Sequence, residues 1–123
     1  MSIIKINYKE INLKGLRKIY EVITDTKVEN IKIYETKTIN PLFDYAIIVT
    51  AKSSRQMQSV INHLRKEEKT GFFKVKSVEG KGGSSWILID LYDYIVNVFL
   101  EAERNVFGLD EVFSELPQIN INK

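Results

Sequence analysis

The chain has no cysteine among its 123 residues. This absence excludes disulfides, thiolate metal sites and cysteine nucleophiles, and it fits a reducing compartment such as the cytosol. No apolar run approaches the roughly 20 residues that cross a bilayer. The first residues also lack the pattern of a secretory signal. The sequence therefore predicts a soluble cytoplasmic protein without a membrane partner.

Histidine is almost absent, and glycine forms only one cluster. His63, the single histidine, has no cysteine or carboxylate cluster at ligand spacing, so we expect it at the surface. The glycines of residues 80–83 indicate a loop, and no phosphate-binding glycine motif or Ser-His-Asp pattern is present. We therefore expect no bound cofactor and no metal.

The length is that of one compact domain, and a chain of this size buries about two-thirds of its unfolded surface. No linker, repeat or low-complexity tract interrupts the sequence. We expect a single domain over residues 1–123 with an ordered core at about 11–117, because Pro117 is taken as the end of the ordered part.

Hydrophobic spacing predicts a mixed α+β domain. Apolar residues at three- and four-residue steps predict a helix over 13–23 and another over 57–64. Ser53 and Gln56 have the form of a capping box for the second helix, which ends near Gly71. One or two short helices are expected within 101–116. Strands are predicted at 31–34, 45–50, 73–78, 86–89 and 94–99, which gives a mixed sheet of about five strands with helices packed on it.

Charge is unevenly distributed, although the net charge is only +2. Residues 1–80 hold 15 Lys and Arg against 9 Asp and Glu, whereas residues 81–123 hold 3 against 7. An acidic end repels phosphate and favours a basic partner. A charge-mixed, solvated surface explains the same counts equally well. Only residues 72–74 interleave aromatic and basic side chains, without an RNA-binding motif around them, so we expect no sequence-specific nucleic-acid partner.

Strand alternation gives the sharpest local inference. Trp86, Leu88 and Asp90 share one face of a strand, because successive side chains point to opposite faces. Burying a lone carboxylate is very costly, so Asp90 places at least its end of this face in solvent. A tryptophan beside a leucine and an acid has the composition of an interface anchor. The alternative is that a helix covers Trp86 and that Asp90 belongs to a turn.

Asp90 and Asp93 also suggest a metal-dependent nucleotidyltransferase-like enzyme, since paired carboxylates hold Mg²⁺ at phosphoryl-transfer sites. Their three-residue spacing across a predicted turn disfavours this alternative, because the two side chains would not align on an extended strand. Ordinary turn chemistry accounts for Asp93.

Arg55 lies in the first turn of a helix, where a cation meets the helix dipole unfavourably. It is either a solvated arginine or a docking residue.

Three segments stand together in the order and spacing of a known family. They are residues 44–56, which read Asp-Tyr-Ala-Ile-Ile-Val-Thr-Ala-Lys-Ser-Ser-Arg-Gln; Glu79-Gly80 followed by Trp86-Ile87-Leu88-Ile89-Asp90-Leu91-Tyr92-Asp93; and Arg104 followed by Phe107-Gly108-Leu109-Asp110. With these motifs the chain resembles the ribosomal silencing factors of the Iojap type over about residues 11–117.

The resemblance implies a nucleotidyltransferase-like fold without the catalytic carboxylates, and hence no enzymatic activity. It also implies docking on the large ribosomal subunit through its fourteenth ribosomal protein. Such docking blocks joining of the small subunit and lowers translation when nutrients are short. Homodimers are expected when the partner is absent. The docking residues that it implies are Trp86, Leu88, Asp90, Leu91, Asp93 and Arg55.

The chain departs from the family pattern at a few positions. Tyr92 stands where the family has a turn glycine, so the hairpin or the docking edge is expected to differ. Asn97 replaces a histidine, which removes a titratable group. Phe107 and Phe113 replace a tyrosine and a tryptophan, and they keep the apolar bulk but lose the polar donors.

Overall fold

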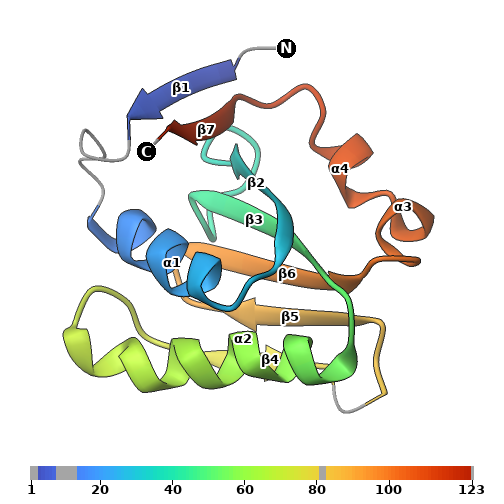
Figure 1. Ribbon diagram of the computed structural model, residues 1–123. Helices are drawn as coiled ribbons and strands as arrows, with labels where there is room; N and C mark the ends of the chain where they lie inside the picture. Colours follow the sequence, from blue (N-terminus) through green and yellow to red (C-terminus); the bar gives the residue numbers. More distant parts are fainter. Residues whose placement is uncertain (1–2, 8–13, 81–82, 123) are drawn as a thin grey trace.

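One mixed β-sheet organises the molecule (Figure 1). The computed structural model describes residues 3–7, 14–80 and 83–122. Within them the sheet has seven strands in the order β1-β7-β2-β3-β6-β5-β4. The strands are β1 (Ile3–Asn7), β2 (Glu29–Glu35), β3 (Tyr45–Ala51), β4 (Ser77–Glu79), β5 (Trp86–Asp90), β6 (Tyr94–Leu100) and β7 (Gln118–Asn122).

The centre of the sheet is the parallel pair β3 and β6. Strand β2 flanks β3 and strand β5 flanks β6, and both flanking strands are antiparallel to their neighbour. Every residue of β3 is buried, as expected for a continuous β-prone run covered on both faces. The expectation of a mixed α+β domain is therefore confirmed.

Two long helices cover one face of the sheet. They are α1 (Lys14–Asp25) and α2 (Ser54–Glu67), and α2 continues into a 3₁₀ turn, η2 (Glu68–Thr70). Apolar residues of both helices join one core cluster with inward side chains of the central strands; Ile19, Leu64, Ile47 and Val98 are examples. Two short helices, α3 (Arg104–Phe107) and α4 (Leu109–Val112), lie on the other face, where Leu109 packs against Tyr34 and Phe99.

The start and the end of α2 follow the predicted signals. The Ser53 hydroxyl accepts a hydrogen bond from the Gln56 amide N–H at 3.1 Å, and the Gln56 side-chain oxygen accepts one from the Lys52 amide at 2.8 Å. Two of the free N–H groups near the helix start are thus satisfied by local side chains. After η2 the chain turns at Gly71, whose φ of +82° is in the left-handed region that favours glycine.

Gly15 lies inside α1 for a steric reason. A Cβ atom at this position would overlap the Tyr94 hydroxyl and would lie 2.9 Å from the Phe72 carbonyl oxygen. Glycine is unfavourable within a helix by about 1 kcal/mol relative to alanine, but here it allows α1 to approach β6 closely.

Three expectations about the strands are wrong. The sheet has seven strands, not about five, because β1 and β7 extend it beyond β2. Pro117 does not end the ordered part, since β7 follows it directly. Proline has no N–H to donate, and a strand tolerates this at its start. The Pro117 carbonyl accepts a hydrogen bond from the Glu35 amide at 2.9 Å. The strand expected at 73–78 is β4, at Ser77–Glu79.

None of the helices within the described ranges has both the length and the apolar character that crossing a bilayer requires.

Candidate docking surface beside Trp86

The face of the sheet on which α3 and α4 lie also carries Trp86. The register of β5 against β6 pairs Trp86 with Phe99, Leu88 with Asn97 and Asp90 with Ile95. Trp86, Leu88 and Asp90 are each half-buried, whereas Ile87 and Ile89 between them are buried under α1 and α2. We call this side the tryptophan face. The alternation inferred from the sequence is therefore confirmed.

The Trp86 indole is fixed by contacts on several sides. Its ring stacks on Phe99 with the ring centroids 5.0 Å apart, and it meets Phe107 of α3 at the same centroid distance. Its Nε1–H donates a hydrogen bond to the side-chain oxygen of Asn97 at 3.1 Å. The helical cover considered in the sequence analysis therefore exists, but it is partial. The Trp86 side chain is therefore half-buried.

A hollow lies against the indole. Its volume is about 210 Å³, and Glu79, Gly80, Trp86 and Leu88 line it. Gly80 has a φ of +96°, and a Cβ there would lie 2.6 Å from the Trp86 carbonyl oxygen. Glycine is thus required by both the backbone conformation and the close approach. Helices α3 and α4 add three exposed apolar residues, Val106, Phe107 and Val112.

The hairpin after β5 engages one of the two aspartates. A carboxylate oxygen of Asp90 accepts a hydrogen bond from the Tyr92 amide at 2.9 Å, and the Leu91 amide donates to the Tyr94 carbonyl at 2.8 Å. Tyr92 has a φ of +71°, the conformation that a glycine adopts most easily. Asp93 is exposed. The Asp90 carboxylate therefore stabilises the turn by accepting this hydrogen bond. Tyr92 adopts a left-handed backbone conformation although it has a side chain.

Two of the expected docking residues lie elsewhere. Leu91 is only 2% exposed and belongs to the core under α1 and α2, so its side chain supports the hairpin from inside and cannot contact a partner. Arg55 is exposed in the first turn of α2, on the opposite side of the sheet from Trp86. The structure brings together Trp86, Leu88 and Asp90, with Asp93 at the end of the hairpin.

A buried ion pair that sequence reasoning missed holds α3 and α4 in place. Arg104 is 5% exposed, and its guanidinium makes two hydrogen bonds to Asp110, at 2.8 and 3.0 Å. It also donates to the Thr50 hydroxyl of β3 and to the carbonyl of Asn30. Asp110 accepts a further hydrogen bond from the Tyr34 hydroxyl at 3.0 Å. In the sequence, Arg104 and Asp110 stood out only as members of the third family motif, and nothing there indicated that they pair.

This network shifts the ionisation of its members. Burial, together with the hydrogen bond to Asp110, raises the pKa of Tyr34 to about 12. Burial by itself would raise the pKa of Asp110, but the hydrogen bonds and charge of Arg104 outweigh it and hold this pKa below its ordinary value. Asp110 is therefore ionised and Tyr34 neutral over the physiological pH range, which keeps the network intact and Phe107 against Trp86.

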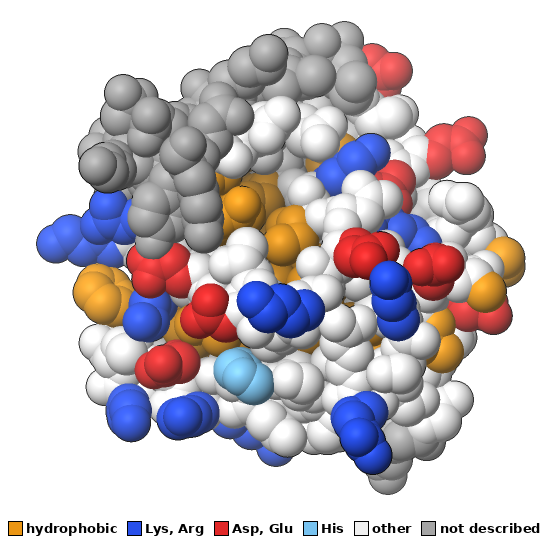
Figure 2. All heavy atoms as spheres, viewed as in Figure 1, with side chains coloured by type: hydrophobic (Ala, Val, Ile, Leu, Met, Phe, Trp, Pro, Cys, Tyr) orange, Lys and Arg blue, Asp and Glu red, His pale blue; other side chains and the backbone are white. Residues whose placement is uncertain are grey.

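Exposed charges differ between α2 and the segment around α3 and α4, although exposed Lys76 lies at the hairpin end of the tryptophan face. Arg55, Arg65, Lys66 and Lys69 are exposed on α2 and η2, and Figure 2 shows Lys and Arg side chains along the lower edge, where α2 lies in Figure 1. Around α3 and α4 the exposed charges are Glu101, Glu111 and Glu115, while Arg104 is buried in its pair. The acidic character of the last third of the sequence is thus present on the side of the tryptophan face.

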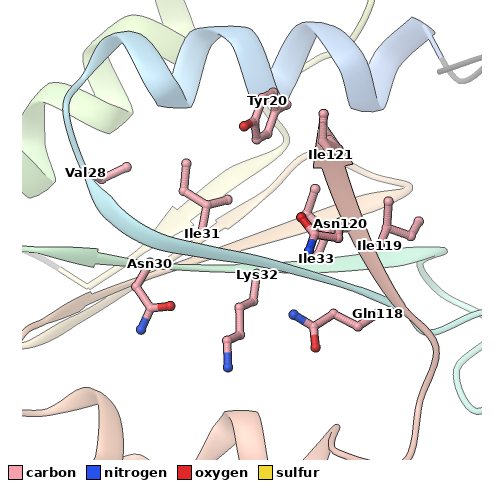
Figure 3. A pocket seen from close by; sticks show the side chains of 10 residues that line it. All are labelled: Tyr20, Val28, Asn30, Ile31, Lys32, Ile33, Gln118, Ile119, Asn120 and Ile121. Atoms are coloured by element: carbon pink, nitrogen blue, oxygen red, sulfur yellow. The ribbon is translucent and has the colours of Figure 1, made fainter. Parts of the chain in front are cut away.

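A larger hollow, of about 400 Å³, opens where β2 and β7 diverge (Figure 3). The two strands pair only at Ile33–Ile119 and Tyr34–Gln118. Aliphatic side chains lie on one side of the hollow, and Lys32, Asn30 and Gln118 lie on the other. None of the residues expected at the site lines it. Among the described residues, no three His, Asp or Glu side chains gather in a group that could hold a metal ion.

Known proteins resemble the chain along nearly its whole length. A family model described as "Ribosomal silencing factor during starvation" matches residues 10–123. The ribosomal silencing factor RsfS of Bacillus subtilis is 28% identical over 112 residues, which cover 90% of this chain and 95% of that protein. The RsfS of Halalkalibacterium halodurans is 27% identical over 110 residues, covering 89% and 94%. The chloroplastic protein Iojap of Arabidopsis thaliana is 27% identical over 101 residues, covering 82% and 42%.

Solved structures agree with this match. A crystal structure of a protein from Bacillus halodurans superimposes with a TM-score of 0.76 at 28% identity, covering 89% of this chain and 99% of that one. An X-ray structure of a protein from Chromobacterium violaceum gives the same TM-score at 25% identity, covering 82% and 84%.

Proposed function

The chain belongs to the family of ribosomal silencing factors during starvation, and from this premise we propose that it docks on the large ribosomal subunit and keeps the small subunit off. The proposed contact is the fourteenth large-subunit ribosomal protein. The proposed result is lower translation under nutrient limitation, in the cytoplasm. Blocking of this kind needs no chemistry, only a folded body that occupies a surface.

The observation that carries the proposal is the state of Trp86. Its indole is held on Phe99 and Phe107 and is only half-buried, so that one part of a large apolar side chain stays available. Anchors of protein interfaces are typically large aromatic residues that are already ordered before binding. The hollow beside Leu88 gives a partner side chain room to enter.

Charge supports a basic partner on the same side. Glu79 lines the hollow beside Trp86, and Asp90 and Asp93 follow at the hairpin. Ribosomal proteins are generally basic, so attraction would speed the encounter and orient it, while apolar contact at Trp86 and Leu88 would supply affinity. We leave Leu91 out of the proposed surface because it is buried.

The alternative of a metal-dependent phosphoryl-transfer enzyme gains no support from the residues that the structure describes. Asp90 is engaged by the Tyr92 amide, and Asp93 is exposed. The relatives are named as silencing factors, which is a regulatory role.

Co-sedimentation with isolated large subunits tests the proposal. The wild-type chain should travel with large subunits and should reduce the formation of joined ribosomes when small subunits are added. Trp86→Ala and Asp90→Lys should lose most of this binding. Arg55→Glu, a charge reversal on the opposite side of the sheet, is the matched control and should bind normally. Each variant is first checked by its thermal melt.

Unchanged binding of both Trp86→Ala and Asp90→Lys would refute the assigned surface. Loss of binding in Arg55→Glu alone would move the contact to α2. A homodimer of the free protein, also expected, is measured by light scattering, and the same Trp86 variant shows whether both partners use one surface.

A further inference from the structure

The hairpin end of the tryptophan face carries a second hollow, separate from the one beside Trp86. Its volume is about 270 Å³, and we call it the hairpin hollow. The residues that line it are Leu42, Phe43, Lys76, Asp90, Tyr92, Asp93 and Ile95. We propose that this hollow receives an arginine side chain of the basic partner. The inference rests on the proposed function and deepens it by naming the partner's chemistry at this place.

The walls of the hollow are fixed before any partner arrives. The loop that carries Leu42 is closed by Thr36, whose amide donates to the Asp44 carbonyl at 2.8 Å and whose hydroxyl donates to the Phe43 carbonyl at 3.1 Å. The Asp44 amide then donates to the Asp93 carbonyl at 2.7 Å. Loop and hairpin are thereby fastened together, so little order has to be gained on binding.

Tyr92 provides an aromatic face for a cation. Its side chain is 52% exposed, and the chain itself shows the mode of contact, because the Lys76 ammonium lies 5.7 Å from the centre of the Tyr92 ring. Cations are attracted to aromatic faces within about 6 Å. An arginine of the partner would meet the same ring and would compete with Lys76 for it.

The remaining groups favour arginine over other side chains. Leu42 is 79% exposed and offers an apolar surface to the aliphatic part of a long side chain. Asp90 and Asp93 carry two negative charges against the single positive charge of Lys76. A planar guanidinium can stack on Tyr92 and pair with a carboxylate at the same time, whereas an ammonium is a compact, strongly hydrated charge.

The first test is Tyr92→Gly, measured by binding to large subunits. Glycine suits the φ of +71° at this position, so the variant removes the ring without straining the fold, and its melting temperature should be equal to or above that of the wild type. Binding should weaken about three- to tenfold. Leu42→Ser should weaken it to a similar degree. Ile39→Ser is the matched control, because Ile39 is exposed in the same loop but does not line the hollow.

The second test uses the free protein and does not involve the ribosome. Acetyl-arginine amide is titrated while the NMR signals of the aromatic rings are followed, with acetyl-citrulline amide as the uncharged control. Arginine amide alone should shift the signals of Tyr92 and its neighbours. Lys76→Ala should strengthen this effect about threefold, because it removes the competing ammonium.

The experiments distinguish failure of the hairpin hollow from failure of the docking surface around Trp86. Normal subunit binding of Tyr92→Gly and Leu42→Ser, together with no arginine-specific shift at the hairpin, overturns the hairpin hollow even if Trp86→Ala loses binding. Normal binding of Trp86→Ala together with weakened binding of Tyr92→Gly overturns the docking surface around Trp86 but still supports an arginine site in the hairpin hollow.

Discussion

The indole N–H of Trp86 donates a hydrogen bond to the side-chain oxygen of Asn97, across the pair that joins β5 and β6. Asn97 is 2% exposed. A polar residue inside an otherwise apolar strand is therefore used to orient the aromatic ring at the surface. This bond links the core of the sheet to the proposed docking surface.

Replacing Asn97 with leucine should loosen the indole. The Trp86 donor would lose its partner, and we expect a loss of about 1–2 kcal/mol in the free energy of unfolding and a red shift of tryptophan fluorescence. The reading is clean because Trp86 is the only tryptophan. An unchanged emission spectrum would contradict the role given to this bond.

Asn97→His offers a control that can be switched. A neutral imidazole can accept the indole hydrogen bond and an imidazolium cannot. The fluorescence of this variant should therefore resemble the wild type at pH 8 and the leucine variant after protonation of the histidine. Wild-type fluorescence should not show this step, since Asn97 does not titrate.

Breaking the Arg104–Asp110 pair should be costly. Asp110→Ala leaves the buried guanidinium with only neutral partners, and we expect a loss of roughly 3 kcal/mol, measured by denaturant unfolding. Because the network holds α3, the contact of Phe107 with Trp86 should loosen too. Glu111→Ala is the matched control on the same helix, where the side chain is exposed, and it should change stability by less than about 0.5 kcal/mol.

The contribution of the Arg104–Asp110 pair to folding stability should depend on pH in the acidic range. The pKa of Asp110 is held low in the folded protein by Arg104, against the effect of burial. Its contribution to stability is thus fully present above the pKa of the unfolded chain, about 3.9, and is lost as the pH falls through the folded value. The stability difference between wild type and Asp110→Ala should shrink below about pH 4. A difference that stays constant to lower pH would contradict the assignment.

The raised pKa of Tyr34 predicts a loss of folding stability at alkaline pH. Burial and the bond to Asp110 raise its pKa to about 12, while an unfolded tyrosine ionises near 10. The folded state therefore loses stability as the pH rises from about 10 towards 12. Tyr34→Phe should reduce this decline, as measured by unfolding at pH 9 and pH 11.

Gly15→Ala should destabilise the protein although alanine is the better helix former. The added methyl group would meet the Tyr94 hydroxyl and the Phe72 carbonyl, and overpacking of this kind costs about 1–3 kcal/mol. Adding Tyr94→Phe removes the hydroxyl and should recover part of the loss. A higher melting temperature for Gly15→Ala would show that α1 can move away from β6 at little cost.

The elements with strong local signals could be predicted from the sequence. Strand β3 is a continuous apolar run, and α2 combines a cap with a regular apolar stripe, so local physics suffices for both. Strand β7 was missed because Pro117 was taken as the end of the ordered part, although Ile119 and Ile121 alternate with polar residues as a half-buried strand requires.

Only the part of the site that lies on strand β5 could be predicted from the sequence. Alternation placed Trp86, Leu88 and Asp90 together. Carried one residue further, it would also have placed Leu91 inside with Ile87 and Ile89, which the structure shows. The partial cover by Phe107 and the Arg104–Asp110 pair depend on how α3 and α4 fold back over the sheet, and no local pattern contains that information.

Strand β1 pairs in parallel with β7, from Ile3–Gln118 to Asn7–Asn122. Among the described strands, the first in chain order thus pairs with the last. Domains fold from the N-terminus while they are made, and pairings between distant segments form late. This edge of the sheet can close only after residue 122 has left the exit tunnel, so β1 has to wait for its partner strand until the rest of the sheet has already been synthesised.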